Sequence, residues 1–485
     1  MEGDGFVRAK IICTIGPASD APETLWAMAE AGMDIARINF SHGDPMSHKN
    51  IFDALEGIDS VSTLLDLPGP KIRLGDVDGS VNLREGQDVH FTTRPVVGSA
   101  DELPISYGRL PEEVRVGGSL FINDGLIEVR VTSIDDDHVG FSGTVISGGE
   151  VVSRKGVNVP GAELSIRPPT EADLEGIQFG AGVCDWFAVS FVRERRDVEN
   201  IRAAIHEAGG DQPIISKIEH REAIENIDEI VEASDGIMVA RGDLGIEVLP
   251  WEVPLLQKRI IGRCNEAGKP VIVATQMLES MVVHPRPSRA EASDVANAII
   301  DGADAVMLSE ETAIGLFPVH AVRAMNSISH TTERSKHEPP RALAVEGSIA
   351  EVMGSLASMA ARTVNPAAII VVTRSGFSVR MVSKYRPRTR ILAVTQSRKV
   401  GKRSRLYWGV EPLDIPWRDD REELLIGAVE RSLELGYIGP EDRVMIVSGS
   451  NLETPGRTST LEILNVDEVI RHASLGGRRS TSEAR

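Results

Sequence analysis

The sequence predicts an α/β fold: an eight-stranded β/α barrel with an inserted antiparallel β lid domain and a carboxyl-terminal α/β domain. Short apolar runs bounded by turn residues alternate with amphipathic stretches, a pattern typical of parallel strands buried on both faces. One connection is much longer than a crossover helix needs, and further apolar runs follow the eighth. At 485 residues, the chain exceeds one domain of about 100–200 residues.

Eight apolar runs are the predicted barrel strands. They are Lys10–Ile15, Asp34–Phe40, Ser62–Leu67, Trp186–Phe191, Pro213–Ile218, Gly236–Ala240, Pro270–Thr275 and Ala303–Leu308. Segments with apolar residues at helical spacing lie between most of them. These are Glu23–Ala31, Asp197–Ala208, Arg221–Ala233 and Leu255–Ala267. The alternation predicts a barrel made from residues 1–75 and 161–335.

The long connection follows the third predicted strand. Residues 76–160 alternate polar and apolar side chains, and turn signals such as Asp78-Gly79 and Asp124-Gly125 interrupt them. This pattern is typical of a small antiparallel β domain. We therefore expect residues 76–160 to form a lid on the barrel.

A second domain is predicted after the barrel. The polar stretch Lys336–Pro340 indicates a linker, and three further buried strands are predicted at Ala367–Thr373, Arg390–Thr395 and Arg443–Ser448. We expect an α/β domain at residues 345–472 and a flexible tail at 473–485.

Charge and composition narrow the possible partners. Lys and Arg number 52 and Asp and Glu 72, and the net charge of −20 would repel nucleic acids and anionic membranes, so neither is an expected partner. The chain contains no apolar run of about 20 residues and no signal peptide, which predicts a cytoplasmic protein. Cys13, Cys184 and Cys264 lie in or beside apolar stretches, which indicates buried thiols rather than disulfides.

Polar residues gather where the predicted strands end. In a β/α barrel the loops after the strands share one face, and the chemistry takes place there. The polar segments are Arg37–His42, Asp66–Arg73, Ser190–Arg193, Lys217–Glu219, Ala240–Asp243, Thr275–Met277 and Ser309–Thr312. Loops are polar in most proteins, so each segment alone is equally compatible with an ordinary loop.

Lys217 and Glu219 are the most informative pair. They end an apolar run and, being two apart on a strand, point to the same side. They are either a plain ion pair or a phosphoryl clamp beside a metal ligand. Mg²⁺ prefers oxygen ligands, and Glu219 with Asp243 from the next strand end would suit it. Arg37 and Arg73 would add the positive charge that phosphoryl transfer needs.

Several motifs resemble those of the pyruvate kinase family. They are Ile12–Ser19, Ala36–Gly43, Ile215–Glu219, Met238–Glu247, Ala274–Met281 and Arg289–Ala313. The resemblance covers essentially the whole chain and implies a barrel, a lid inserted after the third strand and a regulatory carboxyl-terminal domain. It also implies phosphoryl transfer from phosphoenolpyruvate to ADP, giving pyruvate and ATP in the last step of glycolysis, with Mg²⁺ or Mn²⁺ as cofactor.

The resemblance also assigns roles to residues. It implies that Lys217 stabilises the phosphoryl group in flight, that Glu219 and Asp243 hold the divalent metal, and that Arg37 and Arg73 bind phosphate. Thr275 matches a threonine near the enolate carbon, and the backbone at Gly242 and Asp243 would receive the substrate carboxylate. The nucleotide-side positions are Pro17, Asn39, His42 and Arg73, with Lys155 as a candidate from the lid.

Two positions depart from many family members and concern potassium. Asn39, Ser41 and Asp66 match residues around a monovalent cation, but Leu67 and Lys71 stand where many potassium-dependent members have Thr and Glu. The ammonium of Lys71, placed near the same carboxylates, would replace the ion. We therefore expect no requirement for K⁺. Glu310 also stands where some members have glycine.

The carboxyl-terminal domain contains a candidate regulatory loop, and the resemblance implies a phosphorylated allosteric effector and a homotetramer. The loop consists of Thr373, Arg374, Ser375, Gly376, Phe377 and Ser378, between a predicted strand and a helix. It is either a phosphate cradle at a helix start or an ordinary turn. Pro455–Ser459 resembles the family's second effector loop loosely.

Two other functions are compatible with parts of this pattern. A water dikinase or an aldolase acting on phosphoenolpyruvate or a related keto acid would also use a metal-bound enolate. A dikinase requires a phosphohistidine domain, which the sequence does not indicate. A regulatory protein without turnover would not need Lys217, Glu219, Asp243 and Thr275 together.

Overall fold

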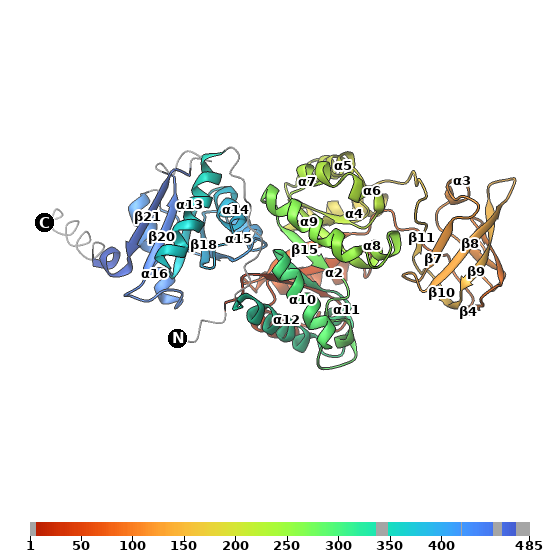
Figure 1. The fold of residues 1–485 in the computed structure, drawn as a ribbon, viewed down its shortest axis with the longest axis horizontal. Helices are drawn as coiled ribbons and strands as arrows, with labels where there is room; N and C mark the ends of the chain where they lie inside the picture. The colour runs from red at the N-terminus through yellow and green to blue at the C-terminus, as the bar shows by residue number, and fades with distance from the viewer. Residues whose placement is uncertain (1–5, 336–347, 419, 450–457, 472–485) are drawn as a thin grey trace.

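The computed structural model describes residues 6–335, 348–418, 420–449 and 458–471. Figure 1 shows three domains in a row, with the barrel between the carboxyl-terminal domain on one side and the lid on the other. The predicted tail at 473–485 and the linker at 336–340 lie outside the described residues.

The central domain is a closed barrel of eight parallel strands, in the order β1-β16-β15-β14-β13-β12-β3-β2. The strands are β1 (Lys10–Ile15), β2 (Ile35–Asn39), β3 (Ser62–Leu67), β12 (Trp186–Val189), β13 (Ile214–Ile218), β14 (Gly236–Ala240), β15 (Val271–Ala274) and β16 (Ala305–Leu308). Each lies within or matches a predicted run. Together with the other two domains, this barrel confirms the predicted fold class.

Helices surround the barrel. They are α1 (Pro22–Ala31), α2 (Pro45–Glu56), α4 (Glu171–Gly180), α5 (Arg195–Glu207), α6 (Arg221–Glu225), α7 (Ile227–Ala233), α8 (Arg241–Glu247), α9 (Val253–Ala267), α10 (Arg289–Asp301), α11 (Glu310–Ala313) and α12 (Pro318–Glu333), with a 3₁₀ turn at Glu279–Val282. Local signals fix several starts. Asp44, Thr170 and Ser288 cap α2, α4 and α10 in capping boxes, which satisfy backbone N–H groups that a helix start leaves unpaired.

Alternation along each strand divides the barrel into two apolar layers. On β3, Leu64 faces the barrel interior with Ile12 and Met238, whereas Leu65 and Leu67 belong to the layer between strands and helices. Because successive strand side chains point to opposite faces, Asp66 faces inward. The site at the barrel mouth is built on this inward-facing set.

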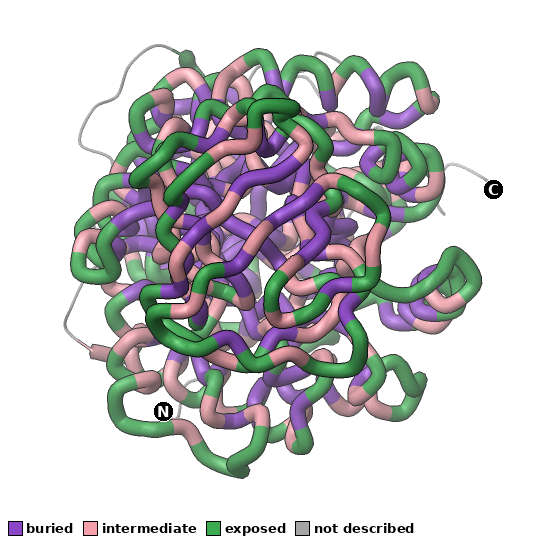
Figure 2. Tube along the Cα trace, turned by 90° about the vertical axis from the view of Figure 1, so that its right-hand side faces the viewer, coloured by how far each residue is buried: buried purple, intermediate pink, exposed green. Residues whose placement is uncertain are grey.

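The lid is a small β domain between β3 and α4. Its elements are β4 (Ser80–Leu83), β5 (Asp88–Thr92), β6 (Glu102–Pro104), α3 (Leu110–Glu113), β7 (Ser119–Ile122), β8 (Ile127–Ile134), β9 (Gly140–Ser147), β10 (Gly149–Val152) and β11 (Val157–Asn158). One sheet has the order β11-β7-β8-β9-β5-β6, and β10 pairs with β4. All pairs are antiparallel except β5 with β6. Figure 2, seen from the lid end, shows buried segments inside exposed loops.

The carboxyl-terminal domain is a five-stranded sheet with helices. Its elements are α13 (Ile349–Val364), β17 (Ala368–Val372), α14 (Phe377–Lys384), β18 (Arg390–Val394), α15 (Arg398–Ser404), β19 (Val410–Leu413), α16 (Arg421–Glu434), β20 (Arg443–Ser448) and β21 (Thr460–Asn465). The strand order is β19-β18-β17-β20-β21, with β21 antiparallel. The sequence predicted β17, β18 and β20 but missed β19 and β21, whose side chains are less completely buried.

The carboxyl-terminal domain closes the end of the barrel opposite the mouth. Leu406 belongs to the apolar cluster of the barrel interior, and the ring of Tyr407 meets Trp186 edge-on, with 6.4 Å between ring centroids. Arg386, itself buried, pairs with Asp304 at 2.8 Å and also donates to Asn265. Apolar and charged contacts therefore join the two domains.

Three further expectations from the sequence concern the cysteines, membrane-spanning helices and the domain boundaries. Cys13, Cys184 and Cys264 are buried free thiols, as predicted. Burial raises the pKa of each thiol, which keeps it protonated and unreactive. No helix in the described part of the chain is long and apolar enough to cross a membrane. The predicted domain boundaries stay predictions.

Candidate active site

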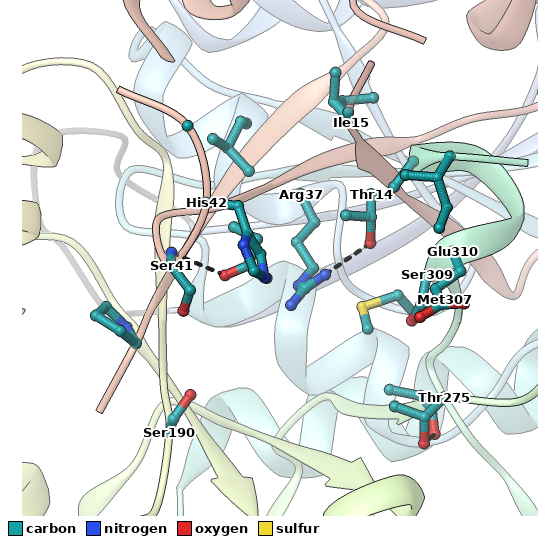
Figure 3. Close-up of a pocket in the computed structure, with 18 of the residues that line it drawn as sticks. Thr14, Ile15, Arg37, Ser41, His42, Ser190, Thr275, Met307, Ser309 and Glu310 are labelled. Carbon is teal, nitrogen blue, oxygen red and sulfur yellow. Dashed lines mark hydrogen bonds between the residues drawn. The ribbon is translucent and has the colours of Figure 1, made fainter. Parts of the chain in front are cut away.

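A cavity of about 870 Å³ opens at the carboxyl ends of the barrel strands. Every one of the eight strands or the loop after it contributes to the lining, and Figure 3 shows side chains from several of them facing one space. The lining includes most of the candidate residues: Pro17, Arg37, Asn39, Ser41, His42, Lys71, Arg73, Lys217, Glu219, Asp243 and Thr275. The barrel thus gathers candidate residues that are up to 258 residues apart in the sequence, from Pro17 to Thr275.

Lys217 is anchored in the cavity wall by three close contacts. Its Nζ lies 2.8 Å from Glu219 Oε1 and 3.4 Å from Asp66 Oδ1, and it donates to Ser190 Oγ at 2.7 Å. Burial alone would lower the pKa of Lys217, but the Asp66 and Glu219 carboxylates outweigh it and raise the pKa. The side chain is 12% exposed, so a fixed positive charge meets the cavity at one place.

Arg37 is held just as firmly from β2. Its Nε donates to Asp66 Oδ2 at 2.8 Å, and its Nη1 donates to Thr14 Oγ1 at 2.8 Å. Burial would raise the pKa of Asp66, but Lys217 and Arg37 outweigh it and hold the pKa below its usual range. Asp66 is therefore ionised and fixes both cations, which are pre-positioned to receive negative charge.

Glu219 and Asp243 are the carboxylates beside these cations. Glu219 is 1% exposed, and its Oε2 accepts from the Phe191 N–H at 2.8 Å. Burial and the Asp243 charge raise the pKa of Glu219 although Lys217 opposes them. Within the described residues, no group of three or more His, Cys, Asp or Glu could hold a metal. A hard cation bound here would take the remaining oxygens from substrate and water, as Mg²⁺ commonly does.

Thr275 stands in a strained loop after β15. Its φ is +70°, unusual for a β-branched residue, and Gln276 follows at +54°. Arg241 supports this loop by donating to Thr275 O at 2.7 Å and to Asp294 Oδ1 at 2.8 Å. Strain of this kind persists only where the surroundings impose it, and it is common at functional sites.

The backbone at Gly242, the predicted carboxylate-binding position, faces Thr275 in this structure. Its N–H donates to Thr275 Oγ1 at 2.8 Å, and Gly242 is not among the cavity-lining residues. A substrate carboxylate bound at this helix start would have to replace the threonine oxygen. Asp243, the next residue, does line the cavity.

The nucleotide-side candidates divide into two groups. Pro17, Asn39, His42 and Arg73 line the cavity, and Asn39 Oδ1 accepts from the Ser41 N–H at 3.1 Å. Burial, reinforced by Arg73, Lys71 and Arg37, lowers the pKa of His42, so its ring is neutral at neutral pH. Lys155 of the lid does not line the cavity, and its carbonyl accepts from the Leu74 N–H at 2.9 Å.

The structure corrects two details of the potassium hypothesis. Lys71 was expected beside Asp66, but its Nζ lies 3.6 Å from Asp243 Oδ1 instead, because Arg37 and Lys217 already occupy Asp66. Leu67 was included in the cation region, but its side chain packs in the layer between strands and helices. The missing hydroxyl at position 67 therefore says nothing about a side-chain ligand.

Sequence reasoning gave no role to several residues that matter. The Ser190 hydroxyl accepts a hydrogen bond from Lys217 and donates one to Leu67 O at 2.8 Å. Thr14 Oγ1 accepts a hydrogen bond from Arg37. Ser309 lines the cavity, and its buried Oγ has no hydrogen-bond partner among the described residues. Figure 3 shows Ser309 next to Glu310 on the cavity wall. The sequence signal that could have identified Thr14, Ser190 and Ser309 is their position at or just after the end of a predicted strand.

In the carboxyl-terminal domain, the predicted regulatory loop leads into α14. Gly376 has a φ of +84°, and its N–H donates to Thr373 Oγ1 at 3.0 Å. The Ser378 hydroxyl is hydrogen-bonded to Thr458, which belongs to the second candidate loop. The two loops therefore meet, although residues 455–457 of the second lie outside the described residues.

Fixed cations and two carboxylates converge at the barrel mouth, an arrangement suited to a phosphotransferase of the β/α-barrel class. The family model of the pyruvate kinase barrel domain matches residues 6–322, and that of the pyruvate kinase alpha/beta domain matches residues 351–464. The chain is 42% identical to a pyruvate kinase of Sporosarcina psychrophila over 476 residues, covering 96% of this chain and 81% of the relative. It is 41% identical to one of Staphylococcus aureus strain MRSA252 over 484 residues, covering 98% and 83%.

The chain belongs to the pyruvate kinase family. It is a phosphotransferase that moves the phosphoryl group of phosphoenolpyruvate to ADP, giving pyruvate and ATP, and its activity depends on a divalent metal. The dikinase, aldolase and non-enzymatic alternatives are therefore set aside.

Proposed function

We propose that Lys217, Arg37 and Arg73 receive the phosphoryl group during transfer, while Glu219 and Asp243 hold Mg²⁺ or Mn²⁺. The observation that carries this proposal is the Lys217 ammonium, buried between Asp66 and Glu219 yet open to the cavity. When bound, the divalent ion supplies Lewis-acid stabilisation of negative charge on substrate oxygens. A coupled assay of pyruvate formation from phosphoenolpyruvate and ADP, with Mg²⁺ and Mn²⁺ varied separately, tests it.

The other residues orient the substrates and move the proton. Thr275 would direct a proton, through water, to the enolate carbon, and the N–H groups at Gly242 and Asp243 would bind the substrate carboxylate. Pro17, Asn39, His42 and Arg73 would contact the nucleotide. Lys155 would reach it only when the lid closes, a motion that would also exclude water. The neutral His42 ring supports a contact with nucleotide rather than a charge clamp.

We expect the enzyme to work without potassium. Lys71 Nζ lines the cavity 3.6 Å from Asp243, so the chain itself supplies a compact positive charge there. Activity should be similar in potassium and tetraalkylammonium salts at matched ionic strength, which controls for screening. Lys71→Glu should lower activity, and added potassium should partly restore it. A wild-type enzyme that is almost inactive without potassium, sodium and ammonium would contradict this role for Lys71.

We also propose that the loop Thr373–Ser378 binds the phosphate of a sugar phosphate or nucleoside monophosphate. The hydrogen bond between Ser378 and Thr458 supports this, because it brings both candidate loops to one place. At subsaturating phosphoenolpyruvate, activation on the order of 5- to 150-fold is expected from one compound of such a panel. Ser375→Asp should abolish it by repelling phosphate, whereas Ser60→Asp on the barrel should not. Activation that survives both Ser375→Asp and Ser378→Asp would exclude this loop.

We propose that the protein is cytoplasmic and forms a homotetramer. Ile349, Val352, Leu356 and Met359 are exposed on one face of α13. Their spacing of three and four residues makes a continuous apolar stripe, which a second copy of the chain would cover. Light scattering coupled to size-exclusion chromatography measures the number of subunits.

A further inference from the structure

The loop after β12 touches both parts of the proposed phosphoryl site. Ser190 Oγ accepts from Lys217 Nζ at 2.7 Å, and the Phe191 N–H donates to Glu219 Oε2 at 2.8 Å. Phe191 has a φ of +57°, so this contact depends on an uncommon backbone conformation. Any displacement of the loop would therefore move partners of Lys217 and Glu219.

The same loop contacts both chain segments that connect the lid to the barrel. In the segment that leads from the barrel into the lid, Gly69 lies against the loop. A Cβ added to Gly69 would be 2.8 Å from the Ser190 Cβ. On the way out, Arg193 Nη1 donates to Leu164 O at 2.8 Å, and its Nη2 donates to Ile166 O. Leu164 packs against the lid core. The Arg193 guanidinium therefore binds two carbonyl groups of the segment that leads from the lid back to the barrel.

Arg193 is itself held in place by burial and by hydrogen bonds of its backbone. Its side chain is 4% exposed. Its N–H donates to Asp197 Oδ2 at 2.9 Å, and its carbonyl accepts from Asn226 Nδ2 at 3.0 Å. A planar guanidinium presents several donors in a fixed fork, so it can hold two carbonyls at once, which a lysine ammonium on a flexible stem does less well.

A small cavity of about 30 Å³ lies at this junction. Its lining combines Ile72 from the segment into the lid and Val159 from the segment out of it with Phe191 and Arg193 of the loop. The Arg193 Nε is buried there without a hydrogen-bond partner among the described residues, 4.0 Å from Glu222 Oε2. The junction therefore holds a small void between the lid segments and the loop that carries Phe191 and Arg193.

We propose that Arg193 is a positioning residue that couples the lid to the phosphoryl site through the loop Ser190–Arg193. When the lid moves, the segment Leu164–Ile166 moves with it, and Arg193 transmits this motion to the partners of Lys217 and Glu219. Conversely, substrate and metal at the site hold the loop and thereby the lid, since coupling between two sites is reciprocal. The inference rests on the proposed roles of Lys217 and Glu219.

The test compares Arg193→Met and Arg193→Lys with Arg195→Met. Arg195 lies two residues further along, is partly exposed and pairs with Glu232, so its loss should change neither readout. The first readout is the separate kcat and KM values for phosphoenolpyruvate and ADP. The second is amide hydrogen exchange of residues 157–166, measured with and without phosphoenolpyruvate and Mg²⁺.

In the wild type, the ligands should slow exchange in residues 157–166. Arg193→Met should lower kcat on the order of 10- to 100-fold, as expected for a small misplacement of reacting groups, and should abolish this ligand-dependent protection. Arg193→Lys should show both effects in milder form and serves if Arg193→Met does not fold. A fall in kcat with normal protection, or normal kcat without Arg193, would overturn the proposal.

The experiment also separates this inference from the assignment of the site. If ligands fail to protect residues 215–219 of the wild type, the assignment of Lys217 and Glu219 fails. If they protect residues 215–219 in every variant but residues 157–166 respond equally in all of them, only the coupling through Arg193 fails.

Discussion

Lys217→Met is expected to lower kcat by about 10²- to 10³-fold, the loss typical of removing one group that stabilises charge in a transition state. Lys217 Nζ is the fixed positive charge between Asp66 and Glu219 at the cavity, and methionine fills similar space without it. The KM for phosphoenolpyruvate should change less than kcat, because the interaction strengthens as the phosphoryl group moves. Steady-state kinetics at saturating metal measure both parameters.

Stability must be measured in parallel, because Asp66 and Glu219 would lose a buried partner. Breaking a buried ion pair commonly costs about 3–5 kcal/mol, although Arg37 still neutralises Asp66 here. Circular dichroism and thermal unfolding separate a folded, inactive enzyme from an unfolded one. Lys258→Met, which removes an exposed lysine paired with Asp301 on the outside of the barrel, is the matched control. A folded Lys217→Met that retains more than about a tenth of wild-type kcat would refute the role, since the loss would be under about 1.4 kcal/mol.

Glu219→Gln and Asp243→Asn should each weaken binding of Mg²⁺ or Mn²⁺ by at least about tenfold, or about 1.4 kcal/mol. Each change keeps the shape of the side chain but removes a negative charge and replaces one oxygen with an amide nitrogen, which does not ligate hard cations. The effect should be larger for Glu219, whose carboxylate is almost completely buried at the cavity wall. Titration by calorimetry measures affinity without requiring turnover.

Glu225→Gln, an exposed substitution on α6, is the control for the change of net charge. Metal affinity unchanged in both Glu219→Gln and Asp243→Asn would exclude the two carboxylates as ligands. If metal affinity falls in Asp243→Asn alone, the broken ion pair with Lys71 is a second explanation for the fall. The double variant Lys71→Met with Asp243→Asn would then separate metal binding from that ion pair.

The barrel was predictable because burial on both faces leaves a simple pattern. All eight strands appear as apolar runs, and the charged residues at their ends meet at one mouth, as barrel topology requires. The side on which Leu67 lies was also open to prediction. Asp66 points inward, so its neighbour on the strand must point outward.

Other features of the site depend on contacts that sequence does not encode locally. Lys71 lies in a loop, and its long side chain reaches Asp243, whereas Arg37 and Lys217 pair with Asp66. Thr275 has a positive φ, and the hydrogen bond that its carbonyl accepts comes from Arg241 at another strand end. The role of Ser190 depends on the approach of Lys217 from the neighbouring strand.

The contact of Leu406 and Tyr407 with the barrel interior has a consequence for the stability of the barrel. These side chains complete an apolar layer that otherwise consists of barrel residues, Trp186 among them. Uncovering large side chains of this kind costs about 1.5–3 kcal/mol each, a substantial fraction of the stability of most proteins. Removal of the carboxyl-terminal domain would therefore uncover part of the barrel interior, so the barrel depends on this domain to complete its apolar floor.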